Sequence, residues 1–423
     1  MSTNIQKNQI TEGIIWRQLL LFFFPILLGT FFQQLYNTID SVIVGQFVGK
    51  EALAAVGGSS AQIVAFVVGF FTGLSSGASV TIAQFFGAKD SRSANKGLHT
   101  AYAIAAFGGL ILTVSGIILT PFLLEMMNTP ADIVADSAVY LRIYFAGIIF
   151  VLIYNMGSAI LRATGDSKRP LYYLIVCCII NIVLDVLFVI VFHMGVMGVA
   201  VATLIAQAVS AVLVTLKLMR SEGILKLSVK QIRFHGSILK MQLKLGLPTG
   251  FEAILFSITN IAIQSAVNTF GTDTTAAWSA YGKLDAIFWM VSTAFGIAIT
   301  TFVGQNYGAG KMDRVRKSTR VCLLMDFIVS AVLVVFLIAA RFLLFRLFTN
   351  DSHVIEIGCD MLVLITPWYI VYVFIEVIAG ALRGVGNVVV PVAITLPWRL
   401  RPSHRMACRP LTENLTVRYR RLF

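Results

Sequence analysis

Two carboxylic acids lie within long apolar stretches of the first half of this chain, where an ionised group is costly. Asp40 stands near the end of one stretch, and Asp185 stands in another, four residues after Asn181. That spacing places Asn181 and Asp185 on one face of a helix, and Thr203 adds a hydroxyl from the next stretch. This set predicts a site for a proton or a sodium ion, because burial disfavours ionised acids and sodium asks for several oxygens. The alternative is a hydrogen-bonded polar cluster that only joins helices.

Polar side chains precede the first acid on the same helix. Gln33, Asn37 and Asp40 fall at helical spacing, so they share one face, and Gln34 and Tyr36 flank this stripe. We therefore predict that Gln34, Tyr36 and Asn37 line a substrate cavity next to the acid.

The second half carries other intramembrane charges. Glu252, Asp285 and Glu376 lie in its apolar stretches. They could line a cavity for cationic substrates, or equally form ion pairs between helices. In this stretch the repeat described below has an offset of 223 residues, which aligns Asp40 with Ile263, so we expect the cation site in the first half alone.

The stretch that ends with Asp40 also contains a proline. Pro25 removes a backbone hydrogen bond and permits a kink, and Gly29 follows it closely. We predict that Pro25 is a hinge.

The elements that must position these residues are membrane-spanning helices. Apolar residues make up 57% of the chain and charged residues 13%, and the mean hydropathy is +0.84. Apolar stretches of about 20 residues, long enough to cross a bilayer, recur without strand-like alternation. We predict an all-α polytopic membrane protein with ten complete spans, at 17–43, 53–76, 97–120, 134–157, 170–192, 195–216, 246–270, 277–303, 318–340 and 358–382.

An internal repeat organises these spans. Leu161-Arg162 and Gly165 return 221 residues later as Leu382-Arg383 and Gly386, and Gln84, Gly87 and Ala88 return as Gln305, Gly308 and Ala309. Such a repeat predicts two pseudo-symmetric helix bundles in a six-plus-six pattern, an architecture that serves alternating access. We predict an N-terminal lobe at 1–216, a linker at 217–245 and a C-terminal lobe at 246–396.

The basic residues predict the orientation. Lysine and arginine concentrate in the N-terminus and in alternate connections, while the intervening connections hold only Lys50, Arg341 and Arg346. The positive-inside rule places the N-terminus and linker 217–245 in the cytoplasm, and it explains the net charge of +13 without a nucleic-acid partner. The linker alternates leucines and isoleucines with lysines, which predicts a helix at the membrane surface. A partner-binding arm is the alternative.

The C-terminal lobe is expected to be incomplete. Pro170 is followed by two further spans, whereas its counterpart Pro391 is followed by a short apolar run and an arginine-rich tail at 397–423. Arginine at the bilayer centre costs about 2.5–3.5 kcal/mol, so spans eleven and twelve are predicted to be missing or aberrant. We interpret the tail as the product of a frameshift or a disrupted gene end. A regulatory tail is the alternative.

Enzyme and metal signatures are weak. Gly73-Leu74-Ser75-Ser76-Gly77 fits the G-x-S-x-G elbow of hydrolases, but Gly69, Gly73 and Gly77 recur every four residues, which is typical of close helix packing. The histidines and cysteines show no metal spacing. We predict neither an enzyme nor a resident cofactor.

Together these motifs resemble the multidrug and toxic compound extrusion (MATE) family. The resemblance rests on Gln33 to Asp40, on Ala54-Ala55-Val56-Gly57 and on the paired repeat elements, and it runs from about residue 13 to 396. It implies twelve helices in two lobes that export amphipathic, often cationic compounds in exchange for protons or sodium ions. In one branch of the family, the matching coupling-site positions are Asp40, Asn155, Asn181, Asp185 and Thr203.

The predicted function is therefore a cation-coupled drug antiporter in a bacterial or archaeal cytoplasmic membrane. We expect a monomer whose partners are small amphipathic molecules and bilayer lipid. Two alternatives remain open, namely a flippase for lipid-linked oligosaccharides with a similar fold and a truncated fragment that does not transport.

Overall fold

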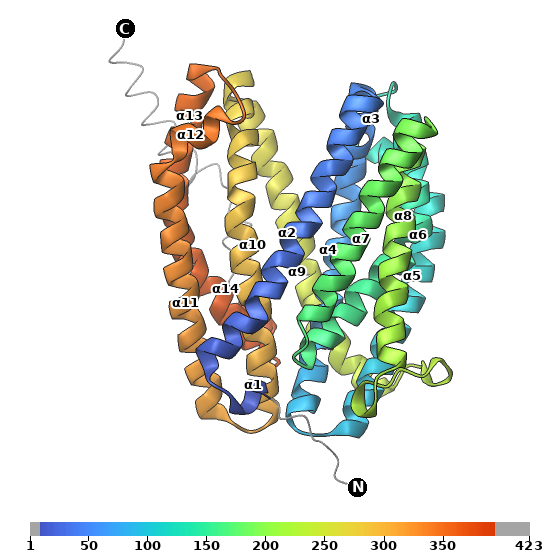
Figure 1. Cartoon of the computed structure of the whole chain (residues 1–423), viewed down its shortest axis with the longest axis vertical. Helices are drawn as coiled ribbons and strands as arrows, with labels where there is room; N and C mark the ends of the chain where they lie inside the picture. Colours follow the sequence, from blue (N-terminus) through green and yellow to red (C-terminus); the bar gives the residue numbers. More distant parts are fainter. Residues whose placement is uncertain (1–8, 394–423) are drawn as a thin grey trace.

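The structure is a computed structural model that describes residues 9–393, and all of its regular elements are helical (Figure 1). The predicted tail at 397–423 lies outside the described residues. The helices are α1 Gln9–Glu12, α2 Ile15–Phe47, α3 Lys50–Gly57, α4 Ser59–Gly87, α5 Ser91–Met126, α6 Val134–Ala163, α7 Lys168–Asp185, the π-helix η1 Val186–Val191, α8 Gly195–Met219, the 3₁₀ turns η2 Gly223–Leu225 and η3 Val229–Gln231, α9 Gly236–Asn268, α10 Thr272–Gly308, α11 Met312–Ala339, α12 Arg341–Arg346, α13 Ser352–Ile365, the 3₁₀ turn η4 Thr366–Trp368 and α14 Tyr369–Gly384.

The prediction of ten spans is confirmed within residues 9–393. Ten helical segments are long and apolar enough to cross a membrane, and each overlaps one predicted span. Three of them combine several elements, because α3 and α4 make one span, α7 and η1 make a second, and α13, η4 and α14 make a third. Most helices extend past their apolar stretches by one or more turns, since backbone hydrogen bonding continues into the polar ends.

Two helix bundles stand side by side, and α2 crosses from one to the other (Figure 1). Its first half packs against α10 and α11, with Phe23 stacked on Phe295 at a ring-centroid distance of 4.0 Å. Beyond Pro25, α2 packs on α3, α7 and η1, beginning at Gly29, which faces Leu174 of α7. Pro25 therefore lies where α2 passes between the two bundles.

The α9 helix makes the reciprocal crossing. Its first half packs closely on α4, because glycines meet glycines there. A Cβ on Gly73 would lie 2.3 Å from the backbone nitrogen of Gly250, and one on Gly77 would lie 2.4 Å from that of Gly246. The predicted small-residue packing face is thus confirmed. Helices α2 and α9 each pack against helices of both predicted lobes. The predicted lobe boundaries therefore remain a proposal about how the sequence is divided.

The linker differs from its prediction. The structure has two short 3₁₀ turns, η2 and η3, in place of a surface helix, and α9 already begins at Gly236. Side chains of α5 hold this segment extended: Asn95 donates to the carbonyls of Ile224 and Lys226, each at 3.1 Å, and His99 Nε2 accepts from the Ser228 amide at 3.0 Å. These side-chain bonds replace the backbone bonds that a helix would have made.

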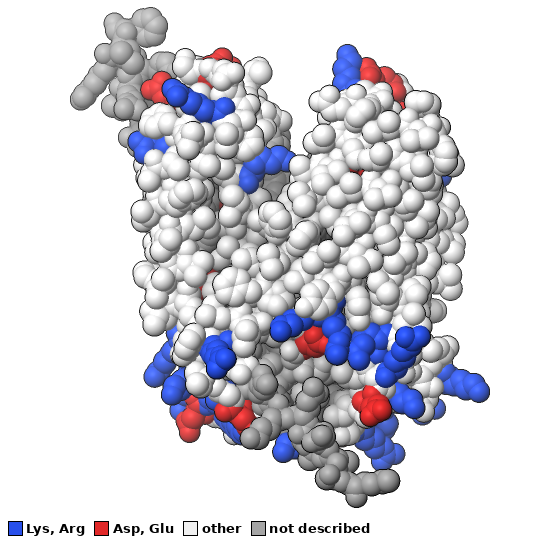
Figure 2. Space-filling model, viewed as in Figure 1, with Lys and Arg blue, Asp and Glu red and all other residues white. Residues whose placement is uncertain are grey.

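The two ends of the molecule differ in charge and in shape. Figure 2 shows lysine and arginine gathered mainly at the end that carries α1 and the start of α5, while a wedge-shaped opening separates the bundles at the end that carries α3, α12 and α13. The bundles meet at the basic end, so the molecule is closed there and open at the opposite end.

Reciprocal hydrogen bonds close the basic end. Gln84 of α4 donates to the Gly384 carbonyl of α14 at 2.8 Å, and Gln305 of α10 donates to the Ala163 carbonyl of α6 at 2.7 Å. Each glutamine is the repeat counterpart of the other, as Ala163 is of Gly384. The internal repeat therefore generates a pseudo-twofold contact in which each half binds the other.

Two glycines let the helices approach at this contact. A Cβ on Gly87 would lie 1.9 Å from the Gln305 carbonyl oxygen, and one on Gly308 would lie 2.0 Å from that of Gln84. Any larger residue would push backbone against backbone, since real Cβ atoms do not approach so closely. The glycine and glutamine of each repeated motif thus act together at one crossing.

Candidate functional site

Helices α2, α7 and α8 bring together four of the residues that the sequence singled out. Asp40, Asn181, Asp185 and Thr203 are buried, with exposed fractions of 8%, 1%, 0% and 6%. They meet because α2 packs on α7 and α7 packs on α8. The Asn181 amide donates to the Thr203 hydroxyl at 3.4 Å, and Asp185, Asn181 and Thr203 all lie close enough to act on the Asp40 carboxyl group.

The acceptor oxygens of this cluster outnumber its donors. Oδ1 of Asp40, Oδ1 of Asn181 and both carboxyl oxygens of Asp185 are buried and accept no hydrogen bond from the described residues. No lysine or arginine of residues 9–393 forms a salt bridge with either acid. Two adjacent carboxylates without a cation are strongly unfavourable away from water. A proton shared between them, or a small cation bound by the same oxygens, would relieve that cost.

A helix irregularity adjoins the second acid. The α-helix α7 ends at Asp185 and continues as the π-helix η1, Val186–Val191. Single π-helical turns occur mostly within α-helices and often at functional sites. The run of apolar residues in this stretch gives no signal for the irregularity, so sequence reasoning missed it.

Three tyrosines lie near this cluster. Tyr36, which the sequence predicted to line a substrate cavity, is 8% exposed. Tyr140 and Tyr144 of α6, which sequence reasoning missed, stack with ring centroids 6.2 Å apart. Tyr140 lies close enough to interact electrostatically with Asp40 and Asp185. The spacing of four between Tyr140 and Tyr144 places both on one face of α6, a signal that was available in the sequence.

Other predicted residues are not part of this cluster. Gln34 and Asn37 are exposed, whereas Asp40 on the same helix is buried. Asn155 of α6 is half-buried, and no hydrogen bond joins it to the four clustered residues among those described. The roles proposed for Gln34, Asn37 and Asn155 therefore stay predictions.

The acids of the second half are paired instead. Arg383 donates to Glu376 Oε1 at 2.7 Å, and its other terminal nitrogen lies 3.9 Å from Glu252 Oε2. The Tyr372 hydroxyl donates to Glu376 Oε2 at 3.1 Å. The side chains of Arg383, Glu252 and Glu376 are 14%, 15% and 17% exposed, so the guanidinium is shared between two poorly hydrated acids. Here the ion-pair interpretation is the one that the geometry supports.

Asp285 is also provided with donors. The Trp289 indole donates to its Oδ2 at 2.7 Å, and the Tyr369 hydroxyl bonds its Oδ1. Tyr281 in turn bonds Tyr369. Asp285 therefore belongs to an aromatic hydrogen-bond chain, which the spacing of these residues in the sequence could not reveal because it joins α10 to α14.

One buried acid escaped the sequence analysis altogether. Asp326 of α11 has an exposed fraction of 0%. Its signal was present, since an aspartate interrupts an apolar run between Met325 and Phe327.

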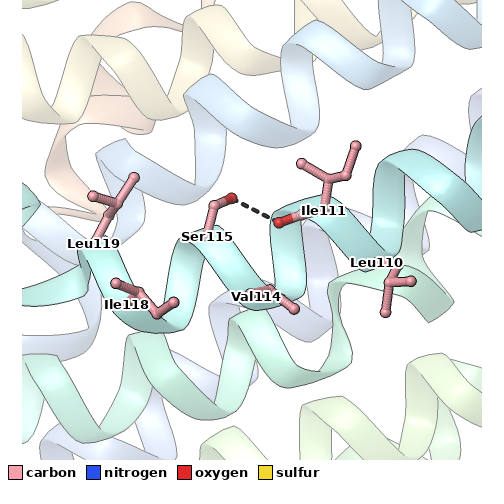
Figure 3. A pocket seen from close by; sticks show the side chains of 6 residues that line it. All are labelled: Leu110, Ile111, Val114, Ser115, Ile118 and Leu119. Atoms are coloured by element: carbon pink, nitrogen blue, oxygen red, sulfur yellow. Dashed lines mark hydrogen bonds between the residues drawn. The ribbon is translucent and has the colours of Figure 1, made fainter.

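An apolar depression of about 510 Å³ runs along α5. Figure 3 shows its lining, in which the Ser115 hydroxyl donates to the Ile111 carbonyl at 2.7 Å. The lining residues are Leu110, Ile111, Val114, Ser115, Ile118 and Leu119. A hollow with exposed aliphatic walls on a single helix suits acyl chains of surrounding lipid better than a specific ligand.

Comparison with known proteins now adds to this geometry. The sequence pattern of the MatE family matches residues 25–187 and 248–397. A Bacillus subtilis (strain 168) protein described as "Probable multidrug resistance protein YoeA" is 30% identical over 390 residues, covering 90% of this chain and 84% of that protein.

Two solved structures share the fold. One, described as "MATE in complex with MaD3S", superposes with a TM-score of 0.88 at 22% identity, covering 96% of this chain and 91% of that one. The other is described as the "outward-facing conformation of a multidrug resistance MATE family transporter" and gives a TM-score of 0.86 at 22% identity, covering 93% and 88%.

Proposed function

The chain belongs to the MatE family of multi-pass membrane transporters, which are not enzymes, and on this premise we propose that it is a cation-coupled multidrug antiporter. It exchanges protons or sodium ions for amphipathic, often cationic compounds. The proposal on drugs draws support from the relatives, whose names describe multidrug resistance proteins.

The observation that carries this proposal is the acid pair of the first half. Asp40 and Asp185 are buried together with four unsatisfied oxygens on themselves and Asn181, and no basic side chain of the described residues neutralises them. Such a pair is stable only when a cation reaches it from outside the protein. A site that must be loaded from the medium is what coupling to an ion gradient requires.

The orientation follows from charge. We place the basic end in the cytoplasm, because lysine and arginine are retained on that side of a membrane. The N-terminus is then cytoplasmic, and the opening between the bundles faces outward across the cytoplasmic membrane (Figure 2). The likeness in fold to a transporter solved in an outward-facing conformation supports this assignment.

The coupling mechanism works through α2. A cation that neutralises Asp40 and Asp185 changes how the second half of α2 packs on α7, while the first half of α2 stays anchored to α10 and α11. Pro25, where α2 passes between the bundles, is the hinge that lets the two halves of the helix move separately. Cation and drug thus bias one two-state equilibrium, which is the thermodynamic basis of exchange.

The substrate class follows from the second half. Glu252 and Glu376 are each slightly exposed and share a single guanidinium, so their surroundings carry a net negative charge. A cationic compound with an apolar body is attracted to such a surface more than an anion is. Asp285, Gln34 and Asn37 remain proposed contributors to the same cavity.

Transport of a fluorescent cationic dye from vesicles tests the proposal. Asp40→Asn is expected to reduce ion-driven dye efflux by about tenfold or more, within the usual range of coupling free energies. Asp136→Asn is the matched control, because Asp136 is an exposed acid of the same half and should leave efflux unchanged. Undiminished efflux by Asp40→Asn would remove the basis of the proposal. Running the assay with a proton gradient and then with a sodium gradient identifies the coupling ion.

A further inference from the structure

Asp326 lies at the centre of α11 on a buried polar stripe. Cys322, Asp326 and Ser330 are spaced by four residues and all have exposed fractions of 0%. They face the core formed with α10 and α14. The Ser330 hydroxyl donates to Asp326 Oδ1 at 3.1 Å, whereas Oδ2 is buried and accepts no hydrogen bond from the described residues.

No lysine, arginine or histidine of residues 9–393 forms a salt bridge with Asp326. Of the titratable groups on α2, α10, α12, α13 and α14, which pack on α11, Glu376 is the one that acts electrostatically on Asp326, and Cys322 does so from α11 itself. Glu376 is negative, and the Cys322 thiol points to the Phe295 carbonyl of α10 at 4.0 Å. Arg383, which pairs with Glu376, is shared between Glu376 and Glu252.

We propose that Asp326 is a second exchangeable cation site, located in the C-terminal half, and that its ligand is a proton. A bare sodium ion would need several oxygens, but among the described residues the one side chain hydrogen-bonded to Asp326 is Ser330, through a single hydroxyl. A proton needs only Oδ2 itself. This site is separate from the Asp40 and Asp185 pair, and the inference does not depend on the proposed function of that pair.

The site has a mechanical consequence. When Asp326 loses its proton, its negative charge repels Glu376. Glu376 holds Arg383, and Arg383 reaches from α14 to Glu252 of α9. The protonation state of Asp326 therefore acts on the contact between α14 and α9, one of the two helices that cross between the bundles.

Infrared difference spectroscopy of the full chain in liposomes tests this inference. The background is the double variant Asp40→Asn with Asp185→Asn, so that this pair contributes no signal. Lowering the pH should protonate the remaining acids and produce several carboxylic-acid bands, and adding Asp326→Asn should remove one of them, the band of Asp326. Asp285→Asn is the matched control and should retain it, because Asp285 is a half-buried acid of this half whose oxygens both have donors.

A conservative variant covers the case in which Asp326→Asn does not fold. Ser330→Ala removes the one hydroxyl that stabilises the ionised carboxylate, so it should move the midpoint of the band to higher pH. A set of bands unchanged by Asp326→Asn, or a midpoint unmoved by Ser330→Ala, would overturn the proposal. Loss of the Asp326 band on adding sodium at constant pH would overturn the assignment of a proton as the ligand.

Discussion

The two halves of the molecule share a helix plan but neutralise their buried acids differently. In the first half, Asp40 and Asp185 lie side by side without a basic partner among the described residues. In the second half, Arg383 bridges Glu252 and Glu376. The internal repeat thus preserved the contact between the halves at the basic end and let the charges diverge. The second half thus supplies a cation for its own acids, whereas we propose that the first half takes one from the medium.

The largest expected effect is on stability and comes from removing Arg383, the cation that the second half itself supplies. Arg383→Gln removes the guanidinium that the poorly hydrated acids Glu252 and Glu376 share, so it should cost about 3–5 kcal/mol of stability. Arg162 is the repeat counterpart of Arg383 and forms no salt bridge within residues 9–393, so Arg162→Gln should cost only about 1 kcal/mol. Thermal unfolding in detergent measures both, and equal losses would erase the contrast between the halves.

The next effect concerns the pseudo-twofold contact at the basic end, which both halves form with equivalent residues. Gly87→Ala and Gly308→Ala each place a Cβ against a carbonyl oxygen of the other half, at 1.9 Å and 2.0 Å before relaxation. Overpacking of this kind costs about 1–3 kcal/mol. Both variants should therefore open the basic end to a similar extent. Spin labels at Ala88 and Ala309 would report longer distances in both; an effect confined to one glycine would show that the contact is not symmetric.

A smaller effect separates the two glutamines. Gln305 is fully buried, so Gln305→Ala leaves the Ala163 carbonyl without a donor and should cost about 1–1.5 kcal/mol. Gln84 is half-buried, and water can replace its bond to Gly384 in Gln84→Ala, so that variant should cost less. The same spin-label distances measure the shift, and a larger effect for Gln84→Ala would contradict this ranking.

The smallest effect concerns the side-chain cap of α5, which the repeat counterpart α11 lacks. Asp90 caps α5 by accepting the Ser93 amide at 3.0 Å, and this hydrogen bond lowers the pKa of Asp90. Its repeat counterpart, Lys311, provides no such cap for α11. Asp90→Ala should cost about 1 kcal/mol or less near neutral pH.

The pH dependence of this cap has a defined sign. Because the pKa is lowered in the folded state, the stabilisation is present above the unfolded pKa, about 3.9, and is lost as the pH falls through the folded value. The difference in unfolding temperature between Asp90→Ala and the parent chain should therefore shrink in acid. A difference that stays constant with pH would show that the carboxylate charge does not contribute.

Local spacing explains what the sequence could predict. The ten spans follow from apolar length, the shared face of Asn181 and Asp185 follows from their spacing of four, and the close packing of α4 follows from Gly73 and Gly77. Each of these is a property of one helix. Long-range contacts were beyond that reasoning, because the pairing of Arg383 with Glu252 depends on how α14 sits against α9.

The linker and Asp326 were also not predicted correctly from the sequence, for two different reasons. The linker was predicted to be helical from its alternation of leucines and lysines, but the side chains of Asn95 and His99 bind its backbone from another helix. Asp326 needed no long-range information, since an acid within an apolar run is itself a signal of an intramembrane site.

Release of the coupling cation on drug binding tests the central claim most directly. A cationic dye such as ethidium, added to the purified chain in weakly buffered solution, should release protons, or sodium ions if sodium is the coupling ion. We expect this release to be lost in the double variant Asp40→Asn with Asp185→Asn and retained in Glu252→Gln with Glu376→Gln. Full release from the first double variant would contradict the account, because the unpaired acids of the first half would then hold no exchangeable cation.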